Sequence, residues 1–378
     1  MPGRSFPRAA TSLDRWGSAS APNPTLAGGG TAEFMTQNLV LGVGAGLVSA
    51  LLFGVLLKAS ALAITLYLLA PLPILIVGLG WSHRAALAAA IAGSLALMAT
   101  VAPFMGLAFA GYVALPGWWL AYLTLLGRET EGGLEWYPTG RLLGWIGATA
   151  ALSFIAIAVL SSPDYDSYET QLKKVAHTLV DPRSPDATRL AARPVQDEAA
   201  KGEPAQPRPT PEAATPDDGT EVTRDELAGA FATVVPALAA HGLALLLTFY
   251  LWAAARIVRI SGRLMRPWPD LPSTQMPRSC LAALAGAAVL SLAPGYAGVL
   301  GVALVGAFTA VFALQGLAAF HDSSRGRPGR GLMLFAMYLV LFVTQGVALV
   351  ALTLFGLADT ALDRRRPKAA IPKGPAAP

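Results

Sequence analysis

Few side chains in this sequence are of the types that carry out acid–base, nucleophilic or metal chemistry. The four histidines are His83, His177, His241 and His321. The four have no metal-ligand spacing among them, and no HExxH motif, phosphate-binding loop or nucleophile elbow occurs. Cys280 is the only cysteine, so no disulfide can form within the chain, and a small buried residue is expected there. The sequence predicts a protein that is not an enzyme and has no metal or cofactor.

The composition is that of a membrane protein. Of the 378 residues, 54% are hydrophobic and 13% are charged, which is too apolar for an ordinary soluble domain. Asp and Glu are absent from 35–127, and within 227–358 the only acids are Asp270 and Asp322, in predicted loops. Ion-coupled transport usually needs a carboxylate within the membrane, so a self-powered pump is disfavoured. The net charge of +5 comes from arginines in short loops beside apolar runs, a pattern of membrane topology and not of nucleic-acid binding.

Nine apolar runs predict an all-α fold, a polytopic integral membrane helical bundle with eight or nine transmembrane segments. The seventh run is short and ends at a Pro-Gly pair, so it either crosses the membrane or is re-entrant. The runs are Leu39–Leu57, Ala61–Trp81, Ala85–Ala102, Met105–Leu126, Arg141–Leu160, Leu227–Arg256, Cys280–Ala293, Ala297–Phe320 and Leu332–Leu357.

Hydrophilic segments divide the chain into two membrane halves, 35–160 and 223–363. The insert between them, 161–222, begins with apolar residues at helical spacing over Tyr165–Val180, which predicts an amphipathic helix lying along the membrane. The rest of the insert is rich in Pro, Ala and acids and is interpreted as a disordered linker. The segments interpreted as disordered tails are 1–34 and 364–378.

The second apolar run is predicted to be kinked, because Pro71 and Pro73 each remove a backbone hydrogen bond and clash with the preceding turn. Interrupted spans often line the binding sites of transporters. His241 is the only ionisable side chain near the middle of a predicted span. These features predict a substrate-binding site whose residues are Pro71, Pro73, Trp118, Trp119, His241 and Gln315, with Gln345 as a further candidate.

Each of these features also has a purely structural interpretation. The prolines could form a kink that lets tight helices pack, and Trp118 and Trp119 could anchor a span end at the lipid headgroups. His241 could be a neutral histidine hydrogen-bonded to a neighbouring helix. Gly42 and Gly46 lie on one face of the first span, where small residues permit close helix packing. The sequence alone leaves the functional and the structural interpretation open.

Four arginines follow the sixth predicted span at helical spacing. They are Arg256, Arg259, Arg263 and Arg266. At about 100° per residue, a continuing helix would gather them in a stripe of about 80°. Such a face would contact anionic lipid headgroups or another membrane subunit, whereas the alternative is charge that only fixes the topology.

The positive-inside rule gives two conflicting topologies. Nine crossings place Arg84, the four arginines and the loop 325–330 in the cytoplasm, but they export the basic residues that follow Asp363. Eight crossings, with Cys280–Ala293 re-entrant, bring these last residues inside but export the loop 325–330. The number of crossings is therefore left open by one.

Several stretches, in their order along the chain, resemble a known family. They are YLLAPLPILIVGLGW, ALPGWWLAYL, EWYPTGRLL, YLWAAARIVRISGRLMRPWPDL, LQGLAAFH and LFGLADTALDRRR. Together they are similar to the alphaproteobacterial branch of the YybS-like family, a domain of unknown function found in bacterial multi-pass membrane proteins, over roughly 35–366 apart from the insert. That family in turn resembles the substrate-binding subunits of energy-coupling-factor transporters. The resemblance implies an all-helical protein of the bacterial inner membrane without catalytic residues.

Two functions follow from these observations. The protein is either a substrate-binding or transport subunit for a small molecule, or a non-transporting membrane scaffold or envelope assembly factor that acts through cytoplasmic basic loops. In both cases the lipid bilayer is a partner.

Overall fold

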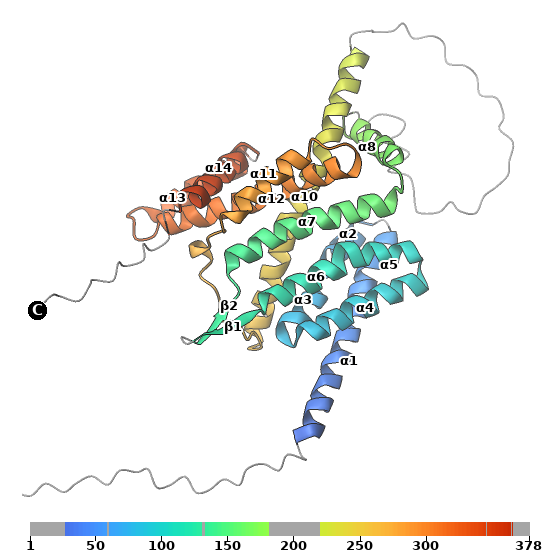
Figure 1. The fold of residues 1–378 in the computed structure, drawn as a ribbon, viewed down its shortest axis with the longest axis vertical. Helices are drawn as coiled ribbons and strands as arrows, with labels where there is room; N and C mark the ends of the chain where they lie inside the picture. Colours follow the sequence, from blue (N-terminus) through green and yellow to red (C-terminus); the bar gives the residue numbers. More distant parts are fainter. Residues whose placement is uncertain are drawn as a thin grey trace, which may run out of the picture.

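The computed structural model describes residues 27–58, 60–130, 133–180, 220–344, 346–363 and 365. These residues are almost entirely helical, and the one strand pair among them is the short hairpin of β1 (Gly127–Thr130) and β2 (Gly133–Trp136) (Figure 1). The predicted tails and linker, and Gln345, lie outside the described residues. Seven described segments are long and apolar enough to cross a membrane, which confirms the predicted all-α membrane bundle. They are Thr36–Lys58, Ala61–Gly80, His83–Thr100, Pro103–Thr124, Thr139–Ser161, Gly229–Ile260 and Gly295–Ser323.

The first four spans of the first membrane half form two helical hairpins that follow each other in sequence (Figure 1). In each hairpin a first span is followed by a span that contains proline and is interrupted in its middle. The first hairpin contains α1 (Ala27–Gly54) with the 3₁₀ turn η1 (Val55–Lys58), then α2 (Ala61–Leu69) and α3 (Pro71–Gly80). The second contains α4 (His83–Thr100), α5 (Pro103–Phe109), the π-helical segment η2 (Ala110–Ala114) and α6 (Leu115–Thr124).

The two hairpins pack in parallel through small residues. A Cβ atom built on Gly46 of α1 would lie 2.1 Å from the carbonyl oxygen of Ala89 in α4, and one on Gly78 of α3 would lie 2.7 Å from the Cβ of Ala121 in α6. The partners in each of these pairs are 43 residues apart. The predicted packing role of the glycine face in the first span is thus confirmed, and the backbones of α1 and α4 come into direct contact.

The second span is interrupted at the position of the predicted kink. α2 ends at Leu69 and α3 begins at Pro71. Proline is well tolerated at this first position, because a backbone N–H there would have no hydrogen-bond partner within the helix. The fully buried hydroxyl of Ser49 in α1 donates to the carbonyl of Ala70 at the break. The interruption is therefore packed against α1 and tied to it.

The second membrane half surrounds α10, the longest helix. α10 contacts α3, α7, α8 and α12, so it joins the two halves. α8 covers the range in which the sequence places an amphipathic helix, and burial of Tyr168 on its inner face raises the pKa of that phenol to about 12. The remaining helices are α7 (Thr139–Ser161), which completes the first half, α8 (Tyr165–Val180) of the insert, α10 (Thr220–Ile260), the 3₁₀ turn η3 (Leu271–Ser273), α11 (Ser279–Leu290), α12 (Gly295–Ser323), α13 (Arg330–Thr344) and α14 (Gly346–Leu362).

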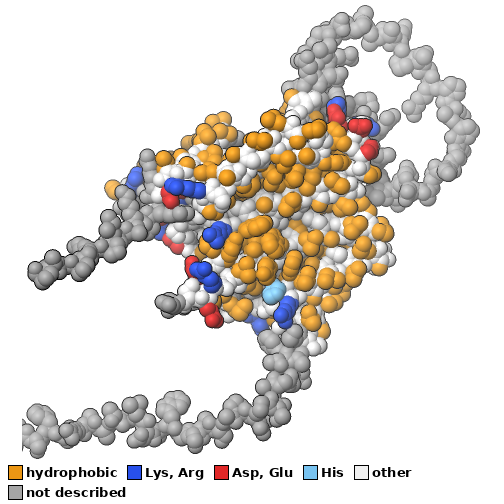
Figure 2. Space-filling view, in the orientation of Figure 1, with side chains coloured by type: hydrophobic (Ala, Val, Ile, Leu, Met, Phe, Trp, Pro, Cys, Tyr) orange, Lys and Arg blue, Asp and Glu red, His pale blue; other side chains and the backbone are white. Residues whose placement is uncertain are grey.

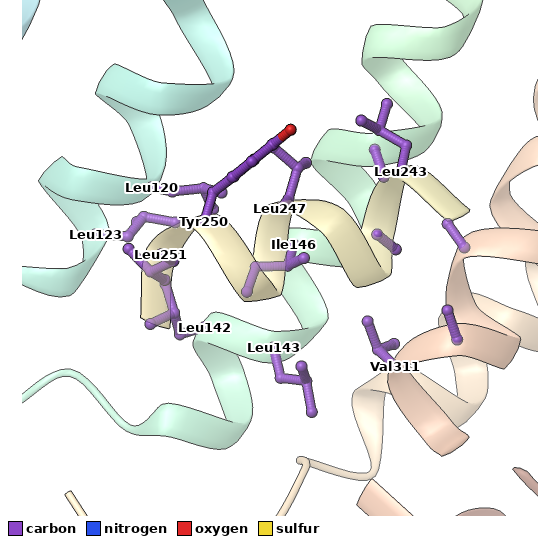
Figure 3. Close-up of a cluster of buried hydrophobic side chains, with 14 of the residues drawn as sticks. Leu120, Leu123, Leu142, Leu143, Ile146, Leu243, Leu247, Tyr250, Leu251 and Val311 are labelled. Atoms are coloured by element: carbon purple, nitrogen blue, oxygen red, sulfur yellow. The ribbon is translucent and has the colours of Figure 1, made fainter. Parts of the chain in front are cut away.

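The main core lies where α6, α7, α10 and α12 meet. Figure 3 shows Leu120 and Leu123 of α6 and Leu251 of α10 close to Leu142 of α7, with Val311 of α12 on the other side. A second cluster joins α1, α3, α4 and η2 around Phe53 and Phe109. The core thus consists of leucine and alanine contacts between helices, and α10 lies at its centre.

The predicted ninth span, Leu332–Leu357, is not one helix. α13 ends at Thr344 and α14 begins at Gly346, on either side of Gln345. Neither helix reaches the length of a membrane crossing.

α14 runs parallel to α12. The hydroxyl of Thr353 donates to the carbonyl of Thr309, and the amide of Gln315 donates to Asp359; in both pairs the residues are 44 positions apart. The C-terminal ends of α12 and α14 therefore lie at the same end of the bundle. Since the chain leaves that end after α12 and returns to it after α14, α13 and α14 form a hairpin and not a crossing.

α11 connects the two ends of the bundle although it is short. It starts beside the end of α14, where Arg278 donates to the carbonyl of Ala361 over 3.4 Å. It finishes beside the start of α12, where a Cβ on Gly301 would lie 2.2 Å from the nitrogen of Ser291. Its 12 residues cover about 18 Å, against about 30 Å for a hydrocarbon core. α11 therefore carries the chain from one end of the bundle to the other, whereas the α13–α14 hairpin starts and finishes at the same end.

This arrangement removes the conflict between the two topologies. Every arginine whose side chain is described lies at one end of the bundle, which we call the basic end, whereas the described charges of the opposite end are Lys58 and those on and just before α8. Figure 2 shows hydrophobic side chains over most of the visible face and Lys and Arg gathered toward the end that carries β1 and β2. The loops of the basic end are 81–82, 125–138, 261–278 and 324–329, together with residues 363 and 365.

We expect the first residue of α1 and the residue after α14 to lie on the same side of the membrane. A phosphatase reporter that is active only outside the cytoplasm should be inactive when fused after Asp363 and active when fused at Asp164, because basic loops stay in the cytoplasm. An active fusion after Asp363, in a protein whose fusion at Arg128 is inactive, would contradict the α13–α14 hairpin.

Candidate functional site

A cavity of about 470 Å³ lies at the basic end. Its walls are apolar and come from α7, α10 and α12, and the loop 261–278 covers one side of it. The hydroxyls of Thr124 and Thr248 reach its wall but donate to carbonyls of their own helices. The lining residues are Thr124, Thr139, Leu142, Leu143, Ile146, Thr248, Leu251, Trp252, Ala255, Leu264, Arg266, Pro267, Trp268, Pro269, Leu271, Pro272, Thr274, Leu314, Leu317, Ala318 and His321.

Arg266 fixes the loop that covers one side of this cavity. Its guanidinium donates to the carbonyl of Thr124 at the end of α6 (3.1 Å) and to the carbonyl of Tyr137 after β2 (2.8 Å). Burial lowers the pKa of the guanidinium, and the residue is only 8% exposed. Arg266 thus joins the loop to the first membrane half, and it does not reach lipid headgroups.

The predicted arginine stripe does not form, because α10 ends at Ile260. Gly262 adopts a positive φ of 72° and donates to the carbonyl of Arg259, while the amide of Arg263 donates to the carbonyl of Val258. These two bonds are the Schellman motif that commonly ends a helix at glycine. The helical projection that placed four arginines on one face therefore fails after Arg259.

Three of the four arginines contact tryptophans at the basic end. The guanidinium carbons of Arg256 and Arg259 lie 5.7 and 4.9 Å from the ring centroid of Trp268, a residue of the cavity wall. That of Arg263 lies 4.6 Å from the ring centroid of Trp81, at the end of α3. Cation–π contacts at such distances hold the arginine stems while the charge remains hydrated.

The prolines and tryptophans of the predicted substrate site lie in the first membrane half, outside the wall of this cavity. Pro71 is buried and Pro73 half-buried at the α2–α3 break. Trp118 and Trp119 belong to an aromatic cluster on α6, in which Trp118 stacks on Tyr122 and Trp119 meets Trp145 of α7 edge to face. The indole nitrogen of Trp118 is buried without a hydrogen-bond partner among the described residues.

His241 and Gln315 face different neighbours. The Nδ1 atom of His241 lies 3.1 Å from the hydroxyl of Thr309 on α12, and its Nε2 is buried without a described partner. Gln315 is fully buried, and its amide donates to Asp359 of α14 over 2.6 Å. The described structure therefore does not gather the predicted substrate residues around one cavity, and their role in binding stays a prediction.

A charged cluster at the basic end has no counterpart among the predicted sites. Arg365 donates to both carboxylate oxygens of Asp359 (2.7 and 2.6 Å) and to Asp322 at the end of α12 (3.3 Å). It also donates to the backbone carbonyls of Pro272 and Thr274, which line the cavity. Arg365 and Asp359 therefore fasten α14 to α12 and to the loop 261–278.

A second, more exposed ion pair joins the same loop to the end of α12. Arg325 binds Asp270 through both of its terminal nitrogens and lies 3.5 Å from Asp322. The hydrogen bonds from Arg325 hold the pKa of the Asp270 carboxyl below its ordinary value. The only sequence signal for either pair was the alternation of acids and arginines near the end of α14 and in the loop after α12. In the part of the chain that the structure describes, no three His, Cys, Asp or Glu side chains come together as a metal site.

The comparisons with known proteins concern the second membrane half. Residues 213–360 match the model of a family described as "Predicted membrane protein (DUF2232)". The matched range includes α10, α12 and α14, and hence two walls of the cavity. No curated protein and no solved structure matches the chain. Over residues 213–360, then, this chain is similar to a family of predicted membrane proteins.

Proposed function

We propose that the protein is a substrate-binding subunit for a small molecule, in the bacterial inner membrane, and that its substrate occupies the cavity at the basic end. The resemblance to the YybS-like family and to the substrate-binding subunits of energy-coupling-factor transporters is part of this proposal. The observation that carries it is the cavity itself. Its volume of about 470 Å³ falls in the range of small-molecule sites, roughly 300–1,000 Å³.

The polar groups around the cavity favour binding without catalysis. The hydroxyls of Thr139 and Thr274 lie 3.3 Å apart and form a hydrogen bond with each other. The Nδ1 atom of His321 is hydrogen-bonded to the carbonyl of Leu317, and its Nε2 atom to the hydroxyl of Tyr338. A nucleophile or general base needs a neighbour that activates it and a free face toward the substrate. We therefore propose a binding subunit and not an enzyme.

A filled cavity is expected to abolish ligand binding. Ala318→Trp places an indole in the cavity wall, whereas Ala351→Trp adds the same group to an exposed alanine of α14. In a thermal-shift screen of purified protein against a metabolite and lipid panel, the compound that raises the unfolding midpoint of the wild type should also raise that of Ala351→Trp, but not that of Ala318→Trp.

The same screen separates this cavity from the site predicted from sequence. If the cavity is the site, His241→Ala and Trp119→Ala keep the ligand-induced shift, because neither residue lines it. Loss of the shift in these two variants, with Ala318→Trp unaffected, would favour the site of the second span and reject the cavity.

The alternative function, a scaffold or assembly factor, is favoured by one observation. Arg256, Arg259 and Arg263 have no carboxylate within ion-pair distance among the described residues, so their charge is available to a partner subunit. If the protein is a scaffold or assembly factor, a photo-crosslinking residue placed at Arg263 should capture one defined protein in cells. A stable adduct of this kind, together with an empty ligand screen, would replace the substrate-binding proposal.

A further inference from the structure

The mouth of the cavity carries two arginines whose charge is not balanced. Arg256 and Arg259 are one turn apart on α10, both are exposed, and both lie over the ring of Trp268. Trp268 is itself part of the cavity wall. Two like charges on one turn repel each other, and among the described residues no carboxylate offsets them.

Four other arginines at the basic end are bound by acceptors within the protein. Arg325 is paired with Asp270, Arg365 with Asp359, and Arg128 with Glu135. Arg266 is buried and bound to two carbonyls. The pair at the cavity mouth differs from these because its guanidinium donors face solvent next to an apolar cavity.

The cavity opens toward the surface of the bundle. Trp252 of α10 and Leu271 of η3 both line it, and they are 45% and 43% exposed. Tryptophans typically lie at the boundary between hydrocarbon and headgroups. Trp252 and Trp268 both line the cavity, so we expect this side of it to lie at the depth where a lipid chain meets its headgroup.

From this juxtaposition we propose that the substrate is an anionic amphiphile, with its hydrocarbon chain in the cavity and a phosphate bound by Arg256 and Arg259. The assignment rests on the proposed substrate-binding function. The guanidinium fork matches phosphate oxygens and gives charge-assisted hydrogen bonds, and the apolar wall gains free energy when it takes up methylene groups. Neither half of the site suffices alone, since the mouth is hydrated and the wall has few free polar groups.

Three probes separate the chain from the phosphate. Dodecyl phosphate carries both, dodecanol carries only the chain, and inorganic phosphate carries only the anion. With purified full-length protein in neutral detergent, we expect dodecyl phosphate to raise the unfolding midpoint in a saturable way, and inorganic phosphate at the same concentrations to leave it unchanged. Dodecanol should bind at least about tenfold more weakly, the loss expected for one charge-assisted hydrogen bond.

Charge removal at the mouth is the decisive variant. Arg256→Gln/Arg259→Gln should weaken the binding of dodecyl phosphate at least about tenfold and leave the binding of dodecanol unchanged. Arg84→Gln/Arg327→Gln removes the same charge from exposed arginines outside the cavity wall and should bind like the wild type. Arg256→Lys/Arg259→Lys keeps the charge and should restore part of the binding, which separates a phosphate contact from a loss of structure around Trp268.

Each negative result has its own meaning. Equal binding of dodecanol and dodecyl phosphate, or equal weakening in both charge-removal variants, would overturn the phosphate site while leaving the cavity in place. Saturable binding of inorganic phosphate alone, with no gain from the chain, would overturn the amphiphile. If Ala318→Trp binds dodecyl phosphate as the wild type does, the proposed function fails together with the inference.

Discussion

Asp359→Ala is expected to lower the free energy of unfolding by about 3–5 kcal/mol, the usual cost of removing one partner from a buried ion pair. The carboxylate of Asp359 is 9% exposed, and it accepts from Arg365, which is 13% exposed, and from the fully buried Gln315. Its removal takes from Arg365 the nearer of its two carboxylates, so that only Asp322 at 3.3 Å remains, and it leaves the amide of Gln315 without its acceptor in a place that water hardly reaches. The measurement is denaturant unfolding of the purified protein, followed by tryptophan fluorescence.

Asp270→Ala is the matched control. Asp270 is also bound by an arginine, Arg325, but its side chain is 50% exposed, so solvent takes over the interaction when the carboxylate is removed. We expect Asp270→Ala to lower the free energy of unfolding much less than Asp359→Ala does. In the double variant Asp359→Ala/Arg365→Ala the loss should be smaller than the sum of the two single losses, because no uncompensated charge remains. Equal effects of Asp359→Ala and Asp270→Ala would show that the buried cluster does not stabilise the fold.

The second large effect is expected for Gly46→Val in α1. The first side-chain carbon would lie 2.1 Å from the backbone oxygen of Ala89, and a backbone atom cannot move aside as a side chain can. Overpacking costs typically about 1–3 kcal/mol, and here relief requires that α1 and α4 separate along their length. We expect α1 to detach from α4, with a large fall in the yield of folded protein.

Gly44→Val tests this on the same helix. A Cβ on Gly44 has nothing within 4 Å, so the added valine should be tolerated. Cysteine crosslinking between α1 and α4 gives the direct measurement, since the only native cysteine is the buried Cys280. A Gly46→Val protein that folds normally and still crosslinks would show that α1 and α4 are further apart than the structure places them.

Sequence reasoning found those parts of the fold that depend on local properties. Apolar runs located the first six spans, and the proline pair at Pro71 and Pro73 located the break between α2 and α3. Helical periodicity located the amphipathic helix α8 at Tyr165–Val180. In each case the signal and the structure lie within one stretch of about twenty residues.

The α13–α14 hairpin could not be found in this way. The run from Leu332 to Leu357 has no charged residue and no proline, and it has the length of a span. Its direction is set by distant contacts, namely Thr353 with Thr309 and Asp359 with Gln315. The one sequence signal was the conflict over charge. The loop 325–330 and the basic residues after Asp363 could not both be cytoplasmic if the run Leu332–Leu357 between them crossed the membrane once.

The candidate site was predicted in part. The four arginines after the sixth span were recognised, but their projection onto one face assumed a helix that Gly262 ends. The cavity itself depends on how the loop after α10 folds back between α7 and α12, which the bonds of Arg266 and Arg365 determine. The carbonyls that accept these bonds are 129 and 142 residues away for Arg266, a distance over which sequence patterns give no pairing.

The α13–α14 hairpin also bears on the order of biogenesis. Everything that α14 packs against, including α12 and the loop that Arg365 binds, leaves the ribosome before Asp359 and Arg365 do. The spans up to α12 can therefore enter the membrane while the cavity is still open on the side of Pro272 and Thr274. Closure of the hairpin, with formation of the Arg365 bonds, is then a late step of maturation. In a nascent chain arrested before Asp359, added protease should cleave the loop 261–278 faster than in the finished protein, where Arg365 holds the carbonyls of Pro272 and Thr274.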